Sequence, residues 1–531
     1  MFYCLFYALN TINMLIKAFA SAVQGVDART ITVEINTGGN VGVDKPMYSL
    51  VGLPDNAVRE GMQRIEAAIN NSGFRVIRLK TTINLAPADI RKEGSAYDLP
   101  IALAYLSGTR QLEPRYLEES LIIGEVSLDG SLRPIKGALP IAIQARKEQF
   151  KYLVLPKANA REAAIVNDLQ VIGVSTLQEA ADWLCGRAEI IPMVVETRDE
   201  FFSNRSNYEV DFSDVKGQEN IKRSLEIAAA GGHNAILIGP PGAGKTMLAR
   251  RLPTILPPLN LSEALETTKI HSVAGVLPVG SSLLTTRPFR APHHTISDVA
   301  LVGGGNNPSP GEISLAHNGV LFLDELPEFK RTVLEVMRQP MEERRVTISR
   351  AKISIDFPAS FMLIASMNPC PCGFFNHPDK ECVCAPGVVK RYLSRISGPL
   401  LDRIDLHVEV TPVSYGELTK QSPSQDSSGD IARRVIKARE IQAERFRNMT
   451  NVHCNAHMQS RMVRDLCTVS TAGVALIKRA MERLQLSARA YDRILKVART
   501  AADLAESPSI ELEHLAEAIH FRNLDREGWA G

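Results

Sequence analysis

The chain has 531 residues, of which 45% are hydrophobic and 23% charged, and its formal net charge at pH 7 is only +2. This length predicts about three domains of ordinary globular composition. The near-neutral charge excludes a polycation, so any contact with nucleic acid has to come from a local basic patch. The 8 cysteines do not form a disulfide framework in a chain of this length, which favours a reducing compartment.

The first residues, Met1 to Ile16, are apolar but make a poor signal peptide. They lack a basic start and a small-residue cleavage site, and Asn10 and Asn13 interrupt a run that is already too short for a membrane span. We therefore expect a cytoplasmic protein with no membrane partner. We interpret residues 1–14 as an apolar extension and Met14 as the true start, so that the residues before Met14 are not native.

Residues 15–187 combine predicted strands and helices. Residues 31–35 alternate apolar and polar side chains, as a half-buried strand does. Asp55 is placed to cap a helix, and the apolar residues of that helix share one face: Val58, Met62, Ile65 and Ile69. Residues 121–123 and 152–155 are typical of further strands. The pattern predicts an α/β or α+β domain, which the charged stretch 196–207 separates from the next domain.

The next segment contains a motif that fits G-x-x-x-x-G-K-[ST] at each fixed position. Its residues are Gly239, Pro240, Pro241, Gly242, Ala243, Gly244, Lys245 and Thr246. An apolar strand is predicted before it, over 235–238, and a helix after it, over 247–252. Strand, glycine loop and helix together hold nucleotide phosphates on backbone N–H groups. Lys245 would reach the β- and γ-phosphates and Thr246 would bind Mg²⁺, so the sequence predicts ATP and Mg²⁺ as ligands.

Two later apolar strands end in polar side chains that suit nucleotide hydrolysis. Residues 320–323 precede Asp324, which could hold the Mg²⁺ shell, and Glu325, which could polarise water. Residues 361–367 precede Asn368, whose amide could hold the attacking water near the γ-phosphate. An asparagine after a strand is otherwise a turn former, and its order behind the two earlier motifs favours the catalytic role.

The segment 271–311 is rich in glycine, proline and histidine and has room for an insertion. His293 and His294 are adjacent and would point in opposite directions on an extended segment. A structural or substrate-contact role is therefore favoured over a metal site.

Residues 345–355 predict a β-hairpin with Arg350 and Lys352 near its tip. Two cations at such a tip could contact DNA phosphates without reading base sequence. The alternative is an ordinary solvated hairpin, and the residues alone leave both open.

Four cysteines follow the third strand as two C-x-C pairs: Cys370, Cys372, Cys382 and Cys384. Four thiolates around a short loop could close a tetrahedral Zn²⁺ site. C-x-C pairs are less typical of zinc than C-x₂-C pairs, and cysteines in a reducing cell can also remain plain thiols. A structural Zn²⁺ and free thiols both stay open.

The polar stretch 421–429 is a predicted linker, and the remainder to about residue 523 is predicted to be helical. Ser487 is placed to cap one helix, whose apolar residues share a face: Tyr491, Ile494, Leu495, Ala498 and Ala502. Another helix is basic: Arg433, Arg434, Lys437, Arg439, Arg445 and Arg447. It also carries Glu440 and Glu444, which favours a solvated face.

The order of these motifs resembles that of AAA+ ATPases. More narrowly, four segments closely resemble the YifB/ComM family of magnesium-chelatase-like ATPases: RAPHH at 290–294, DELPEF at 324–329, SMNPCPCG at 366–373 and GPLLDRID at 398–405. The resemblance covers about residues 15–523. The fold class it implies is α/β, with three parts: an N-terminal Lon-protease-like α/β domain at 15–187, a P-loop AAA+ core at 208–412 and a C-terminal helical lid at 430–523.

The resemblance also implies a mechanism shared between subunits. Arg403 would be an arginine finger that reaches the γ-phosphate of the neighbouring subunit, and Arg489 would be a second sensor on the lid. Arg395 is a weaker rival to Arg403. Because a finger supplied by a neighbour requires an oligomer, the expected partner is further copies of this chain in a ring, most commonly a hexamer. Residues 214–218 would line the adenine pocket.

Residues 92–100 and 124–130 resemble the proteolytic domain of Lon, which would imply an ATP-dependent Ser-Lys protease. In this chain the nucleophile position falls on Ala96, with Ser95 one place early. The position of the general base falls near Leu139, with Lys136 out of step. Because a Ser-Lys dyad needs both groups within hydrogen-bond reach, we expect a Lon-like fold without peptidase activity.

The YifB/ComM resemblance implies an ATP-driven ring motor that acts on DNA, in branch migration or helicase-like remodelling. The alternative is a chelatase-like ATPase that remodels a protein partner. An ATP-dependent Ser-Lys protease is the least favoured reading. The step from fold to substrate is an analogy.

Overall fold

The computed structural model describes residues 14–40, 47–198, 201, 208–278, 280–305, 308–350, 353–375, 377, 380–413, 426–450, 452–484 and 486–522. Residues 1–13, which precede the predicted start at Met14, lie outside this set. The chain divides into two compact units: unit 1 comprises residues 1–203 and 264–284, and unit 2 comprises 204–263 and 285–531. No helix within the described ranges has the length and apolar character needed to cross a membrane.

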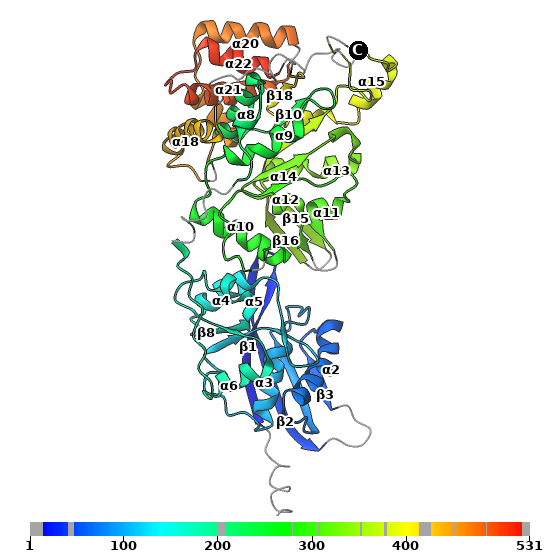
Figure 1. Ribbon diagram of the computed structural model, residues 1–531, viewed down its shortest axis with the longest axis vertical. Coiled ribbons are helices and arrows are strands. Elements are labelled where there is room, and N and C mark those ends of the chain that lie inside the picture. Colours follow the sequence, from blue (N-terminus) through cyan, green and yellow to red (C-terminus); the bar gives the residue numbers. More distant parts are fainter. Residues whose placement is uncertain are drawn as a thin grey trace, which may run out of the picture. The chain divides into compact units, whose positions relative to one another are not determined.

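Unit 1 is built on a mixed sheet with strand order β3-β4-β2-β1-β5-β8-β9 (Figure 1). Its strands are β1 Met14–Gln24, β2 Asp27–Asn40, β3 Tyr48–Val51, β4 Leu79–Ala86, β5 Ser120–Ile122, β8 Tyr152–Pro156 and β9 Gln170–Val174. A small ribbon pairs β6 Glu125–Val126 with β7 Leu132–Arg133. The helices are α2 Asn56–Asn71, α3 Asp98–Gly108, α4 Ala138–Lys147, α5 Lys157–Ala163, α6 Leu177–Leu184 and α10 Leu261–Ala274, whose residues from Ala264 onward belong to unit 1.

Local sequence signals explain several of these elements. The Asp55 side chain accepts a hydrogen bond from the backbone N–H of Val58 at 2.9 Å and caps α2, because the first N–H groups of a helix have no partner within it. Helix α2 then buries the apolar face predicted for it. The predicted strand 31–35 lies within β2, where all of its apolar residues are fully buried.

Unit 2 contains a parallel sheet with strand order β11-β14-β17-β10-β18. The strands are β10 Ala235–Ile238, β11 Phe289–Arg290, β14 Val320–Leu323, β17 Met362–Met367 and β18 Leu406–Glu409. All residues of β10, β14 and β17 are buried, as expected for central strands of a parallel sheet covered on both faces. The carboxyl ends of these three strands therefore meet at one edge, where ligands of open α/β sheets bind.

The helices of the core are α8 Glu219–Gly231, α9 Lys245–Arg251, α11 Asp298–Val302, α12 Glu312–Leu315, α13 Arg331–Val336, α14 Arg338–Glu343, α15 Pro386–Leu393 and α16 Gly398–Leu401. Short 3₁₀ turns cover Phe212–Asp214, Leu252–Thr254 and Leu326–Glu328. Two antiparallel pairs join β12 Gly303–Gly304 to β13 Ser309–Pro310 and β15 Arg345–Arg350 to β16 Ile353–Pro358. The second pair confirms the predicted hairpin.

The C-terminal part of unit 2 is helical, drawn in orange and red in Figure 1. Its helices are α18 Ser428–Arg445, α19 Ser460–Leu466, α20 Thr471–Leu484, α21 Ala488–Leu504 and α22 Leu512–His520, with a 3₁₀ turn at Asn455–His457. Ser487 caps α21 as predicted, because its side chain accepts from the Ala490 N–H at 3.2 Å. The predicted fold class is confirmed: mixed α/β units with a parallel-sheet core followed by helices.

Candidate nucleotide-binding site

The glycine loop follows the central strand β10, and its backbone conformation explains its composition. Gly242 and Gly244 have φ of 80° and 84°, a left-handed region that other residues adopt only at a cost. A Cβ atom on Gly239 would lie 2.2 Å from the carbonyl oxygen of Val410. Glycine is therefore needed at these three motif positions for the path of the loop itself.

Lys245 is buried, and its ammonium lies inside the loop. Its Nζ donates hydrogen bonds to the carbonyl oxygens of Gly239 at 2.7 Å and Pro240 at 3.0 Å, and to Oδ1 of Asn368 at 3.1 Å. Burial lowers the pKa of Lys245, and the negative charges of Asp324 and Glu325 act in the opposite direction. The structure thus brings the predicted phosphate-binding lysine together with Asn368, which is predicted to hold the attacking water, although the two are far apart in sequence.

The two predicted Mg²⁺ ligands also lie side by side. The Thr246 hydroxyl donates to Oδ2 of Asp324 at 2.7 Å, and the Ser366 hydroxyl donates to Oδ1 of the same carboxylate. A hydroxyl and a carboxylate are the oxygen donors that a hard cation such as Mg²⁺ prefers. Ser366, to which sequence analysis gave no role, orients this carboxylate from strand β17.

Glu325 follows Asp324 in the sequence, but its side chain is exposed to solvent. Its φ of 55° is left-handed, and its side chain is 58% exposed, so the carboxylate is open to water. Nδ1 of His294 lies 3.8 Å from Oε2 of Glu325. The sequence predicts a structural or substrate-contact role for His294, but no local pattern reveals its proximity to Glu325.

Gln218 connects the loop to the edge strand of the sheet. Its Nε2 donates to the carbonyl oxygens of Ala243 at 3.0 Å and Thr411 at 3.2 Å. Its Oε1 is buried, and none of the described residues donates a hydrogen bond to it. A buried acceptor of this kind suits a donor from a ligand. The role of residues 214–218 in lining the adenine pocket stays a prediction.

The three arginines predicted for hydrolysis differ in their surroundings. The side chain of Arg403 is only 10% exposed; it donates to the carbonyl oxygen of Pro399 and pairs with Glu342. Arg395 is 52% exposed and lies 3.0 Å from a carboxylate oxygen of Glu328. Arg489 is 66% exposed, and its Nη1 lies 3.9 Å from Oδ2 of Asp402, the residue before Arg403. Within this chain, Arg395 is therefore more accessible than Arg403.

A buried carboxylate joins the core to the lid helix that carries Arg489. Asp405 pairs with Arg493 of α21, and its Oδ2 lies 3.2 Å from Nδ1 of His233 at the end of α8. Burial alone would raise the pKa of Asp405, but the charge of Arg493 and the hydrogen bond with His233 hold it well below its usual range. This network holds α21 at Arg493, which lies one helical turn after Arg489 in the same helix.

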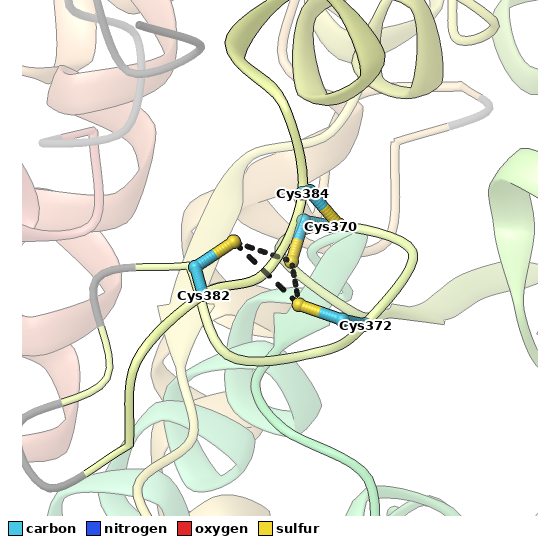
Figure 2. Close-up of side chains that lie close together, drawn as sticks. All are labelled: Cys370, Cys372, Cys382 and Cys384. Carbon is cyan, nitrogen blue, oxygen red and sulfur yellow. Dashed lines mark hydrogen bonds between the residues drawn. The ribbon is translucent and has the colours of Figure 1, made fainter.

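The four cysteines converge on one point, as Figure 2 shows. The Sγ atoms of Cys370, Cys372 and Cys382 are separated by 3.3, 3.7 and 3.5 Å. All four sulfur atoms, including that of Cys384, lie within 4.8 Å of one another. Partial burial acts to raise the pKa of Cys372, but backbone N–H groups and neighbouring thiols lower it to about 6. No disulfide joins any of the cysteines among the described residues.

The predicted DNA contacts are only partly within the described residues. The backbone of Arg350 ends β15, but its side chain and the whole of Lys352 lie outside the described residues. The cations of α18 have intramolecular partners: Arg434 pairs with Glu226, Arg445 with Asp503 and Lys437 with Glu506. Arg434, Lys437 and Arg445 of α18 therefore do not form an unpaired basic surface.

The residues compared with the Lon protease do not form a dyad. The Ser95 hydroxyl donates to the carboxylate of Glu125. Within the described part of the chain, no hydrogen bond joins Ser95 to Lys136. A Ser-Lys dyad needs the two groups within hydrogen-bond reach, so Ser95 and Lys136 do not form one here, and the lack of peptidase activity stays a prediction.

Comparison with known proteins matches most of the chain to one family. The family described as magnesium chelatase, subunit ChlI, matches residues 211–418. Subunit ChlI of Mg-chelatase matches residues 33–159, and the ChlI C-terminal family matches residues 425–522.

Individual relatives indicate the same family as these matches. The chain is 42% identical to competence protein ComM of Haemophilus influenzae, over 96% of this chain and 97% of that protein. It is 42% identical to YifB of Escherichia coli, over 95% of this chain and 96% of that protein. The 38 kDa magnesium-chelatase subunit of Rhodobacter capsulatus is more distant, 27% identical over 30% of this chain and 50% of its own length. The chain therefore belongs to the YifB/ComM family of magnesium-chelatase-like AAA+ ATPases.

Proposed function

We propose that this protein hydrolyses ATP to ADP and phosphate at the carboxyl edge of the unit 2 sheet. The observation that carries the proposal is the convergence of three strand ends. Lys245 contacts Asn368 at 3.1 Å and Thr246 contacts Asp324 at 2.7 Å. A basic side chain, an amide and an oxygen pair for Mg²⁺ are the groups that phosphoryl transfer to water requires.

Each residue has a distinct role in this proposal. The loop 239–244 and Lys245 bind the phosphates, while Thr246 and Asp324 would hold Mg²⁺, which neutralises phosphate charge when bound. Glu325 is open to solvent and accepts a proton from the attacking water. Asn368 orients that water. The test is steady-state hydrolysis of Mg-ATP by the purified chain, with Lys245→Ala as the inactive control.

Hydrolysis is proposed to take place in a homo-oligomeric ring, with Arg403 of one subunit acting on the nucleotide of the next. Arg403 is paired with Glu342 in the single subunit, so the neighbouring phosphate would have to replace that carboxylate. Arg489 contributes from the lid of the same subunit. A planar guanidinium matches phosphate oxygens in a way that lysine does not.

The proposed substrate of the motor is DNA, in branch migration or helicase-like remodelling. Support comes from the similarity to a competence protein over 96% of the chain and from the hairpin β15–β16, whose first strand ends at Arg350. The paired cations of α18 do not contribute to this argument.

A chelatase-like ATPase that remodels a protein partner is the second candidate, because the matching families describe the ChlI subunit of magnesium chelatase. The ATPase rate of the full chain should be measured with forked DNA, single-stranded DNA or unfolded protein. Stimulation by DNA alone supports the first candidate, and stimulation by protein alone supports the second. The third reading, a Ser-Lys protease, requires casein degradation that Ser95→Ala abolishes.

A further inference from the structure

The arrangement of the four cysteine sulfurs matches the dimensions of a metal site. Zinc bound by thiolates has Zn–S distances of about 2.3 Å, which places neighbouring sulfurs of a tetrahedron about 3.8 Å apart. The separations among Cys370, Cys372 and Cys382 are 3.3 to 3.7 Å. A disulfide would need about 2.0 Å.

The donor set is chemically selective. Among the residues that the structure describes, the cluster contains four cysteines and no histidine or carboxylate. Thiolates favour soft or borderline cations in tetrahedral geometry, whereas Mg²⁺ takes oxygen ligands. This site is therefore distinct from the pair Thr246 and Asp324. Four protein ligands leave no open position, which is typical of a structural zinc rather than a catalytic one.

The segment that carries Cys382 and Cys384 has little apolar packing to hold it in place. Val383, between Cys382 and Cys384, is 84% exposed. Since burial of apolar side chains is the usual source of such stability, this short segment needs another interaction to remain next to Cys370, which is fully buried.

The cluster adjoins the nucleotide site on two sides. Asn368 lies two residues before Cys370, at the end of β17. Gly373 closes a turn by donating its N–H to the Cys370 carbonyl at 3.0 Å. A Cβ on Gly373 would lie 2.4 Å from Cδ of Pro241, so this turn packs directly on the phosphate loop.

A third connection runs through the helix that follows the cluster. Helix α15 begins two residues after Cys384. Its Tyr392 is buried, which raises the pKa of the phenol to about 12, while a backbone hydrogen bond from Asn368 acts to lower it. The cysteines thus lie between Asn368, which precedes them in the sequence, and Tyr392, which follows them and contacts Asn368.

We propose that the four cysteines bind one structural Zn²⁺ that holds Asn368 and the turn on Pro241 in position for ATP hydrolysis. The metal half of this proposal is independent of the proposed function, and the positioning half rests on it. Cys370, Cys372, Cys382 and Cys384 are metal ligands, and through them the metal positions Asn368 without touching the nucleotide.

The metal half is tested on the full-length chain purified under reducing conditions. Elemental analysis should find about one zinc per chain, since a closed site binds one ion. Cys382→Ser plus Cys384→Ser should lose it, while Cys185→Ser, which changes a buried cysteine outside the cluster, should keep it. Replacement by Co²⁺ should give the visible absorption of tetrahedral cobalt thiolate. No zinc after reconstitution, or iron in its place, overturns the proposal.

The positioning half is tested by the kinetics of the same variants. The double serine variant should lower kcat by about 10²-fold, the effect of misplacing a reacting group by about 1 Å, with KM for ATP nearly unchanged. A chelator should lower the kcat of the wild type, and added Zn²⁺ should restore it. This experiment needs no substitution, so its result does not depend on whether a variant folds. Zinc loss without a change in kcat overturns this half. If Lys245→Ala and wild type are equally active, the proposed function fails instead, and the zinc content still decides the metal half.

Discussion

Nζ of Lys245 lies 3.1 Å from Oδ1 of Asn368, which links the start of α9 to the end of β17 through a hydrogen bond. The amide oxygen therefore faces the lysine, and the amide nitrogen of Asn368 is directed elsewhere. This contact orients the side chain that we propose to hold the attacking water.

Replacing Asn368 by alanine should slow hydrolysis without preventing nucleotide binding. We expect kcat to fall by about 10²-fold, the typical effect of removing one polar group that acts in the transition state, with KM changed little. Steady-state kinetics at saturating Mg-ATP would show this. Asn71→Ala, on the surface of unit 1, is the matched control, and equal losses in the two variants would contradict the role of Asn368.

Glu325→Gln should keep ATP bound but unhydrolysed. The loss of a general base lowers turnover by about 10²–10⁴-fold, whereas the phosphate contacts of Lys245 remain. Rapid filtration of labelled ATP together with product analysis would detect this trapped state. His294→Ala should cause a smaller loss of kcat, because its ring lies 3.8 Å from Glu325; full activity of this variant would argue against a positioning role for His294.

Arg403→Ala should bind ATP and lose about 10³–10⁵-fold in turnover, the contribution expected of an arginine finger. Mixing this variant with Lys245→Ala subunits should restore part of the activity. At some interfaces the intact phosphate loop of an Arg403→Ala subunit then lies next to the intact Arg403 of a Lys245→Ala subunit. Recovery in mixtures of Arg395→Ala with Lys245→Ala, but not with Arg403→Ala, would assign the finger to Arg395.

Asp405→Asn should destabilise unit 2 by about 3–5 kcal/mol, because it leaves Arg493 without its partner in a buried site. The native pKa of Asp405 is depressed, so its stabilising contribution is present above the unfolded pKa of about 4 and is lost as the pH falls below it. Chemical denaturation of wild type and variant at several pH values should show a difference that is constant near neutrality and shrinks in acid. A constant difference down to strongly acidic pH would contradict the ionised network.

Charge reversal at Arg350 and Lys352 should weaken DNA binding and reduce its salt dependence, because each phosphate contact contributes about 0.7–0.9 to the slope of log K against log salt. Arg433→Glu plus Lys437→Glu changes charge equally on α18 and is the control, since both side chains have carboxylate partners there. Equal effects of the two double variants would remove the hairpin as a specific contact.

Features encoded in short stretches of sequence could be predicted, and those formed by distant residues could not. The caps at Asp55 and Ser487 depend on a backbone N–H three residues ahead, so the pattern predicts them directly. By contrast, Gln218 bridges Ala243 and Thr411, and Asp405 joins His233 to Arg493. Such contacts depend on strand order, which apolar periodicity does not specify.

The cysteine cluster lies between these two cases. Its spacing indicated four possible ligands, but only the fold shows that the sulfurs converge. The turn at Gly373 on Pro241 could not be predicted, since nothing in either residue specifies the other.

The assignment of residues 264–284 to unit 1 has a consequence for dissecting the protein. The chain passes from one unit to the other after residues 203, 263 and 284, so no cut at a single peptide bond separates unit 1 from unit 2. Removing residues 1–203 would also strip the partners of α10, such as the Gly137 N–H that donates to the Ser272 carbonyl at 3.0 Å. A shortened ATPase would then carry an uncovered helix in its middle, and its tendency to aggregate would be mistaken for loss of activity.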